Sequence, residues 1–230
     1  MAGLDYTTRD KALWGALLAL RLASAAAYVL WALPAMPETV PTHWGVDGTA
    51  DGWDSKGSTL FMGALMPVLI LALLFAVPHF DPRGESFNRF KDIYEGFSAA
   101  FTVFMVVVAW ITPLSALGVL PTTGGSVVNI IVFGFLGLLF VGLGVAMPRI
   151  EPNYTFGVRL PWTLADTENW RRTHRFAGPV FVVMGVVTVA SALLASMAPE
   201  LTLVVLLVAL LGGVALVALY SFLLWKGVIR

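Results

Sequence analysis

The residues with the clearest capacity for chemistry lie in one polar stretch, residues 152–178, between two long apolar segments. Amide, guanidinium, indole, hydroxyl, carboxylate and imidazole groups occur there within a single loop, at Asn153, Arg159, Trp162, Thr163, Asp166, Trp170, His174 and Arg175. Asp166 and His174 are residue types that perform general acid–base catalysis. However, no serine or cysteine is paired with a histidine, no second histidine lies nearby, and no phosphate-binding loop is present. The stretch therefore predicts a binding loop, and no enzyme is expected.

A second polar stretch, residues 34–58, concentrates acidic and aromatic side chains. Its candidate binding residues are His43, Asp47, Asp51, Trp53, Asp54 and Lys56. Imidazole and carboxylates are ordinary ligands of divalent cations, but the spacing matches neither an EF-hand loop nor a zinc-protease motif. Asp47-Gly48 and Asp51-Gly52 are also turn signals, because these residues tolerate the left-handed backbone. We expect a folded, turn-rich cap without a metal or cofactor, with metal binding as the alternative.

Six apolar segments must position these two stretches. Hydrophobic residues form 58% of the chain, above the roughly 45–50% of soluble domains. Each segment is close to the ~20 residues that an α-helix needs to cross a bilayer, and none shows the alternation of a membrane β-barrel. The prediction is an all-α polytopic membrane helical bundle with about six transmembrane helices, a multi-pass protein of the cell membrane. The expected spans are Ala12–Leu33, Thr59–Pro78, Phe97–Gly118, Val127–Met147, Ala177–Met197 and Leu201–Trp225.

The distribution of positive charge predicts the orientation. Twelve of the fourteen Lys and Arg residues lie near the two termini, at residues 83–91 and in the 148–176 loop, whereas the other loops hold only Lys56. Since cytoplasmic loops are enriched in Lys and Arg, both termini and the 148–176 loop are expected in the cytoplasm, with the 34–58 loop outside. The outer loop has more acidic than basic residues, which could attract a cationic peptide. A formal net charge of zero gives no reason to expect direct nucleic-acid binding.

The arginine-rich loop ends in the pattern of an amphipathic helix. Thr163 and Asp166 have capping-box spacing, so the Thr163 hydroxyl is expected to accept the amide hydrogen of Asp166. Trp170 and His174, four residues apart, share one face, which should point toward the membrane or the bundle. A helix break is expected at residues 178–179, before the next span. Such a helix is either an interfacial anchor or a specific binding element, and both interpretations stay open.

Arg21 is the one ionisable residue deep inside a predicted span. At the ~1.5 Å rise per residue of a helix, it would lie roughly 15 Å into the membrane. A central arginine costs about 2.5–3.5 kcal/mol on insertion scales and marks function or a buried pair by default. No acidic residue lies deep in another predicted span, so the candidate polar neighbours are Thr102, Thr112, Asn129 and Thr188. The alternatives are an outward shift of the span and extension of the side chain to the cytoplasmic surface.

Both polar stretches resemble one family. In the inner stretch, the similarity to the signature of the SdpI-type bacterial immunity proteins rests on Pro152-Asn153, Gly157-Val158-Arg159, Pro161-Trp162-Thr163-Leu164, Trp170, Thr173-His174 and Gly178. The outer stretch resembles an uncharacterised N-terminal module that is often fused to that domain. This similarity rests on Pro41 to Gly48, Asp51-Gly52-Trp53 and Lys56-Gly57. The resemblance implies two modules. Residues 1–96 would hold spans one and two with the 34–58 loop, and residues 97–230 would hold spans three to six with the 148–176 loop.

The same resemblance implies a function in immunity and signalling. Its members are described as multi-span membrane proteins. The expected function is protection of the cell from a toxic peptide, with docking of a cytoplasmic regulator as a second role. The expected partners are therefore the lipid bilayer, a secreted toxic peptide outside and a repressor-like regulator inside.

A small-solute or ion transporter of the inverted-repeat type is the alternative function. Six spans divide into three plus three, which gives two halves of opposite orientation. In each half a long motif-bearing loop follows the first span, and the Gly45-Val46 pair in one loop faintly echoes Gly157-Val158 in the other. The predicted spans nevertheless show no interrupted helix pairs and almost no buried charge. A purely structural membrane protein is a third interpretation.

Overall fold

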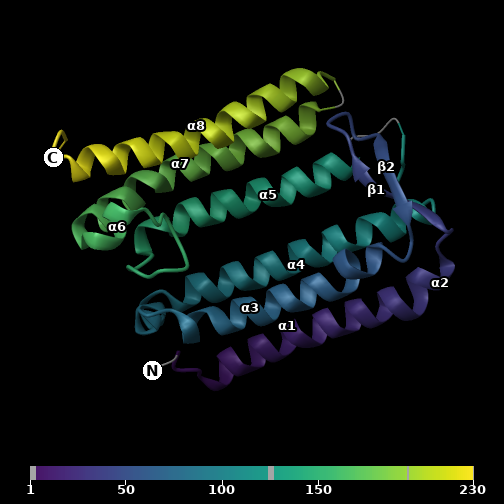
Figure 1. Cartoon of the computed structure of the whole chain (residues 1–230), viewed down its shortest axis with the longest axis horizontal. Helices are drawn as coiled ribbons and strands as arrows, with labels where there is room; N and C mark the ends of the chain where they lie inside the picture. Colours follow the sequence, from purple (N-terminus) through teal and green to yellow (C-terminus); the bar gives the residue numbers. More distant parts are fainter. Residues whose placement is uncertain (1–3, 124–126, 196, 230) are drawn as a thin grey trace.

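Six long helices form a bundle in the computed structural model, which describes residues 4–123, 127–195 and 197–229. Each helix is long and apolar enough to cross a membrane; the six are Thr8–Ala35, Phe61–Phe80, Lys91–Ala116, Val127–Arg149, Thr167–Leu194 and Pro199–Trp225. They run along the long axis of the molecule, with both chain ends on one side (Figure 1). The predicted all-α polytopic bundle is confirmed. The two predicted modules, residues 1–96 and 97–230, include residues 1–3, 124–126, 196 and 230, which lie outside the described residues.

The first two spans contain π-helical turns. In the first, α1 (Thr8–Ala27) passes into η1 (Tyr28–Ala32) and α2 (Leu33–Ala35). The second begins as η2 (Phe61–Leu65) and continues as α3 (Met66–Phe80). The Tyr28 ring packs directly on Gly63, where a Cβ atom would come within 2.3 Å of it. Since π turns often occur at functional sites, the region around Tyr28 is a place to look for one.

A two-stranded antiparallel hairpin, β1 (Thr39–Trp44) with β2 (Ala50–Ser55), caps one end of the bundle. Its register is irregular between Pro41 and Trp44, because proline has no N–H to donate to the ladder. Gly48 has a φ of 78° in the turn, a conformation that favours glycine. The expected folded cap is therefore present as a hairpin. We call residues 36–58 and 117–123 the hairpin end.

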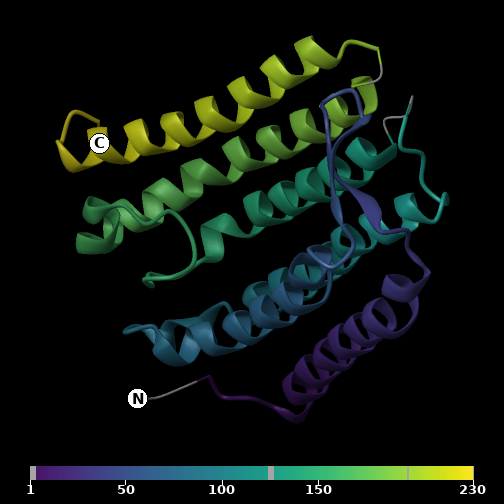
Figure 2. The same ribbon diagram turned by 45° about the vertical axis from the view of Figure 1, so that its right-hand side comes forward.

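The helices form two sets of three, α1 with α3 and α4, and α5 with α7 and α8 (Figure 1 and Figure 2). The main helix contact between the sets is the seam between α4 and α5. The helix α4, which the predicted module boundary assigns to the second module, thus packs with the first set. The remaining elements are η3 (Gly84–Arg89), α4 (Lys91–Ala116), α5 (Val127–Ala146), η4 (Met147–Arg149), α6 (Pro161–Ala165), α7 (Thr167–Leu194) and α8 (Pro199–Trp225).

Glycines bring α5 and α7 into close contact. A Cβ atom at Gly137 would lie 2.7 Å from the carbonyl oxygen of Gly185, and one at Gly144 would lie 2.6 Å from that of Gly178. Small residues allow such close approach of helices in lipid. The predicted break at residues 178–179 is wrong, because α7 continues through it. Packing of Gly178 on α5 supports the helix at this point.

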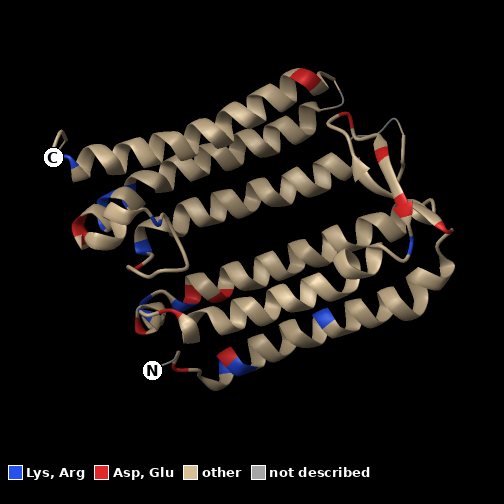
Figure 3. Ribbon diagram, in the orientation of Figure 1, with Lys and Arg blue, Asp and Glu red and all other residues tan. Residues whose placement is uncertain are grey.

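Positive charge is concentrated at one end of the bundle, whereas acidic residues occur at both ends (Figure 3). Lys and Arg gather at the end that holds both termini, which we call the arginine end (residues 4–11, 79–91, 149–175 and 226–229). In the described residues of the hairpin end, Lys56 is the only cation. The two polar stretches identified in the sequence therefore lie at opposite ends of one bundle.

Replacing Gly144 with alanine should destabilise the bundle, because the added methyl group would meet the Gly178 carbonyl oxygen at 2.6 Å. Overpacking of this kind costs about 1–3 kcal/mol. Gly142→Ala is the matched control, since no atom lies within 4 Å of a Cβ at that position. The midpoint of thermal unfolding in detergent measures both variants. Equal midpoints would contradict the close packing of α5 on α7.

Candidate functional site

Asn153 organises the tight turn at the start of the 148–176 loop. Its side chain is fully buried. The amide nitrogen donates to the carbonyl oxygens of Glu151 and Phe156, both at 2.9 Å. The amide oxygen accepts from the backbone N–H groups of Thr155 at 2.9 Å and Phe156 at 2.6 Å. Because these bonds use the hydrogen-bonding capacity of the amide, Asn153 positions the loop and has no polar group left for a ligand.

His174 closes the same loop from α7. Its ring stacks on Trp170 with a centroid separation of 4.1 Å, and both residues are buried. Nε2 accepts the backbone N–H of Val158 at 3.0 Å, and Nδ1 donates to the carbonyl oxygen of Trp170 at 2.9 Å. This pattern defines a neutral imidazole with the proton on Nδ1. Gly157, with a φ of 113°, leaves room for the ring, because a Cβ there would lie 2.5 Å from Nε2.

Asp166 caps α7, and the predicted cap at Thr163 is wrong. Asp166 has an extended backbone, and its Oδ1 accepts the amide hydrogen of Glu168 at 2.8 Å. The Thr163 hydroxyl instead accepts from the N–H of Leu160 and lies 2.9 Å from the carbonyl oxygen of Val158. The reason is that a separate short helix, α6, precedes α7 and contains Thr163. Thr163 and Asp166 thus have the sequence spacing of a capping box but do not form one at the start of α7.

Trp162 fixes the loop to the last helix. Its Nε1 donates to Ser221 Oγ of α8 at 2.8 Å, and its ring contacts Trp225 at a centroid distance of 5.9 Å. Asn169 donates to the carbonyl oxygen of the same serine at 3.0 Å. Asn169 and Ser221 were not among the predicted site residues. A lone serine in the otherwise apolar end of α8 was the available signal.

Asp81 connects the loop to the first helix set. One carboxylate oxygen accepts from the Tyr154 N–H at 2.9 Å and from the Thr155 hydroxyl at 2.7 Å. The other accepts from the N–H of Arg83 at 2.7 Å, and the Arg83 guanidinium lies 5.0 Å from the centre of the Tyr154 ring. Phe156 inserts beside the first set, with its ring 5.5 Å from that of Tyr94. Sequence reasoning missed Asp81, since its partners are more than 70 residues away.

The exposed residues of the loop form its accessible surface. Arg159 is exposed, and its guanidinium donates to the carbonyl oxygen of Tyr154 at 3.1 Å. Asp166 and Arg175 are also exposed, and Arg171 pairs with Glu168. The predicted site residues thus divide by burial. The ones that hold the loop are Asn153, Thr163, Trp170 and His174, all buried; Arg159, Asp166 and Arg175 are accessible, and Trp162 is half-buried.

The acidic residues of the hairpin serve separate local roles. His43 Nδ1 pairs with Asp51 Oδ1 at 2.5 Å, and Lys56 pairs with Glu38 at 3.0 Å. Asp47 accepts the N–H of Thr49, a bond that lowers the pKa of the Asp47 carboxyl. Across the described ranges, no three His, Asp or Glu side chains converge as a metal site would require. Trp53 is 54% exposed.

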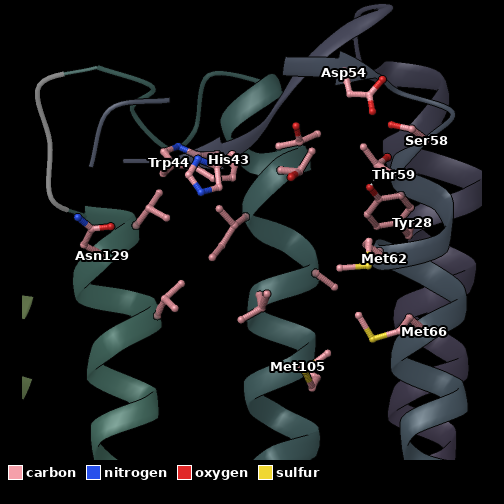
Figure 4. A pocket seen from close by; sticks show the side chains of 18 of the residues that line it. Tyr28, His43, Trp44, Asp54, Ser58, Thr59, Met62, Met66, Met105 and Asn129 are labelled. Atoms are coloured by element: carbon pink, nitrogen blue, oxygen red, sulfur yellow. Dashed lines mark hydrogen bonds between the residues drawn. The ribbon is translucent and has the colours of Figure 1, made fainter. Parts of the chain in front are cut away.

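A cavity of about 440 Å³ lies beneath the hairpin, between α3, α4 and α5 (Figure 4). Of the predicted hairpin residues, His43 and Asp54 line it. Its wall includes the buried Tyr28, whose hydroxyl donates to Thr59 Oγ1 at 2.7 Å. Across the seam, Asn129 of α5 donates to the carbonyl oxygen of Val46 at 2.6 Å and so holds the hairpin over the second helix set. The other lining residues are Thr42, Trp44, Ser58, Met62, Gly63, Met66, Met105, Val108, Ala109, Ile111, Thr112, Val128, Val132 and Phe133.

Arg21 is buried inside the first helix set. It is 2% exposed, so its side chain does not extend to the surface. Its Nε and Nη2 atoms have no hydrogen-bond partner within the part of the chain that the structure describes. Two of the predicted polar neighbours are engaged elsewhere, since Thr188 donates to Met184 within α7 and Asn129 holds the hairpin.

The register of α1 against α4 places Thr102 as the predicted neighbour nearest Arg21. Trp14 donates to Glu95 at 3.3 Å below this level, and Trp110 donates to Ser24 at 2.9 Å above it. Glu95 is buried in the second turn of α4, near the arginine end. It falls within this span because α4 begins at residue 91, six residues before the predicted start. It does not lie deep in the span.

Asp81→Ala should loosen the 148–176 loop, because the Tyr154 N–H and the Thr155 hydroxyl lose their acceptor. Leaving buried donors unpaired costs about 1–3 kcal/mol. We expect a lower midpoint of thermal unfolding and faster tryptic cleavage after Arg159. The control is Glu85→Ala, which removes an exposed carboxylate from the same segment. Unchanged cleavage of the Asp81 variant would show that this residue does not hold the loop.

Comparison with known families matches both halves of the chain. Residues 149–221 match the SdpI/YfhL protein family, and residues 21–71 match a domain of unknown function, DUF1648. The chain is 28% identical over 192 residues to the Immunity protein SdpI of Bacillus subtilis (strain 168), covering 83% of this chain and 86% of that protein. No solved structure matches. The resemblance predicted from the two polar stretches is thereby confirmed: this multi-pass cell-membrane protein is similar to the SdpI immunity proteins over most of its length and carries the DUF1648 match in its N-terminal part.

Proposed function

We propose that this immunity-type membrane protein protects its cell from a toxic peptide that arrives at the hairpin end. The observation that carries the proposal is the similarity to an immunity protein over most of both chains. The sorting of charge supports it, since the arginine end has the composition of a cytoplasmic face and the hairpin end that of an outer face.

Electrostatics favour a cationic peptide. The hairpin end has one lysine, Lys56, which is already paired with Glu38. Its acidic residues are Glu38, Asp47, Asp51 and Asp54. An excess of one sign of charge raises the local concentration of the opposite charge and speeds encounter. The peptide would therefore be drawn to the hairpin before it reaches the bilayer.

The arginine end is the proposed docking site for a cytoplasmic regulator. Its loop is held from both helix sets, by Asp81 from the first and by His174 from the second. Such a fixed loop presents Arg159 and Arg175 on a rigid support, which lowers the entropy cost of binding. A regulator with an acidic surface fits this charge. The partner inside and the peptide outside would then contact opposite ends of the same bundle.

The orientation is tested by single cysteines in a chain that has none of its own. Glu38→Cys reports on the hairpin end and Glu168→Cys on the arginine end; both positions are exposed. A maleimide that does not cross membranes should label position 38 in intact cells and position 168 only after permeabilisation, because arginines are retained inside. The reverse pattern, or labelling of both positions in intact cells, would refute the proposed division of faces.

Protection is tested by deleting the gene in its native host and challenging the cells with toxic peptides secreted by that host. Deletion should lower the tolerated dose, and the unaltered gene should restore it. A variant with Asp47→Asn, Asp51→Asn and Asp54→Asn should restore about tenfold less, because electrostatic attraction of the peptide is lost. A variant with Arg171→Glu and Arg175→Glu should keep protection and lose any regulatory response. Unchanged sensitivity on deletion would end the immunity proposal.

Transport across the bundle is supported less well by the seam between the helix sets. A second cavity, of about 320 Å³, lies between α4 and α5 toward the arginine end. Phe104 of α4 and Phe135 of α5 meet within the seam at a ring-centroid distance of 6.1 Å. The residues that line the second cavity are almost all apolar, which offers no polar path for an ion or a small polar solute.

A further inference from the structure

The cavity beneath the hairpin has the size and construction of a ligand site. Its volume of about 440 Å³ lies within the roughly 300–1,000 Å³ of small-ligand pockets. Both helix sets and the hairpin contribute to its wall, so three parts of the chain meet there (Figure 4). Thr42, His43, Asp54 and Ser58 are exposed at its rim. The deeper wall is buried or half-buried and comes mainly from α4 and α5.

The lining changes from polar to apolar with depth. Asp54 and Ser58 lie near the hairpin, whereas Met66 and Met105 lie further along α3 and α4 (Figure 4). Methionine is flexible and polarisable, so it adapts to apolar groups of different shape. Val132 and Phe133 continue this surface on α5. A ligand with an apolar body and a polar end at the rim fits this gradient.

The negative charge of Asp54 at the rim favours a ligand whose polar end is positively charged. Asp54 is exposed, and one of its oxygens accepts the backbone N–H of Ser55 at 2.6 Å. The other nearby charges are engaged, since His43 pairs with Asp51 and Lys56 pairs with Glu38. The Asp54 carboxylate therefore has no cationic partner in the described residues. A basic group placed at the rim would supply one.

The indole N–H of Trp44 is not available to a ligand in the cavity. Its Nε1 atom has no hydrogen-bond partner among the described residues, but it is buried beneath the surface of the wall. Trp44 contributes other atoms to the wall beside His43 (Figure 4). The distinction between a peptide and a hydrocarbon chain therefore rests on Asp54, because a hydrocarbon chain has no basic group.

We propose that this cavity binds an apolar segment of a cationic peptide. A basic group of the peptide lies beside Asp54, and apolar side chains occupy the methionine-lined interior. That this peptide is the toxic one rests on the proposed function, whereas the chemistry of the site does not. The closest competing occupant is a lipid acyl chain.

The test uses the full chain in phosphatidylcholine nanodiscs with one cysteine in the cavity wall. Thr112→Cys is the reporter because threonine and cysteine are similar in size, and Met105→Cys is a second reporter deeper in the wall. The probe is the acetylated tetrapeptide amide Lys-Leu-Leu-Phe, and the matched peptide has Glu in place of Lys. At a concentration about four times its Kd, the lysine peptide should slow alkylation of the cysteine by N-ethylmaleimide about fivefold. The glutamate peptide should have little effect.

Two variants sharpen this test. Asp54→Asn should remove the difference between the two peptides, because the carboxylate that would pair with the lysine is lost. Thr39→Cys, at an exposed position of β1 outside the cavity wall, should be alkylated at the same rate with and without peptide. Slower alkylation there would indicate that the peptide acts on the bilayer surface and would count against the cavity.

Equal protection by both peptides, or none by either, would overturn the proposal. Reporters that react only after lipid is removed would identify an acyl chain as the occupant and would also overturn it. The lysine peptide could protect the cysteine selectively while deletion of the gene leaves toxin sensitivity unchanged. That result would support the binding site and reject the immunity function. If neither peptide protects selectively but deletion abolishes immunity, the binding site is rejected and the immunity function is supported.

Discussion

Two side chains, Asp81 and Asn129, join the two sets of three helices through hydrogen bonds. The direct helix contact between the sets is mostly the seam between α4 and α5. Asn129 of the second set holds the hairpin that follows the first span. Asp81 of the first set holds the loop that follows the fourth span. Each long loop thus crosses to the other helix set and satisfies polar groups there, which matters because unpaired polar groups are costly next to lipid. The order of both ends of the bundle depends on this exchange.

The exchange explains why the most polar residues of the 148–176 loop are also among the most buried. Asn153 and His174 are surrounded by backbone groups that need partners, and they supply both donors and acceptors. A neutral imidazole whose two nitrogens are both hydrogen-bonded has a structural role and is not a reactive group. The binding that we propose at this end therefore falls to the exposed arginines that the loop carries. The hairpin end is built differently, because its polar residues surround a cavity and Asp54 at the rim has no cationic partner in the described residues.

Arg21 remains the most costly residue of the first helix set. Its guanidinium is buried with unpaired N–H groups, and the hydroxyls of Ser98 and Thr102 on α4 are also unpaired in the described structure. Glu95 lies on the same face of α4, about two helical turns from Thr102 by the rise of an α-helix. These groups form a polar strip inside an apolar helix set. Such strips weaken packing and are retained where conformational specificity or function requires them.

The sequence by itself determined the six spans, the concentration of positive charge at one end and the resemblance to the SdpI immunity proteins, because length, hydropathy and local motifs are short-range properties. It also determined that Trp170 and His174 share a helix face, which follows from their spacing of four. Tertiary structure alone decided which motif residues are buried, that Asp166 and not Thr163 caps α7, and that Asp81 and Ser221 hold the loop. It alone formed the cavity, whose wall joins residues from Tyr28 to Phe133. These features depend on contacts between segments far apart in the chain, and no local pattern encodes which distant backbone group a side chain will meet.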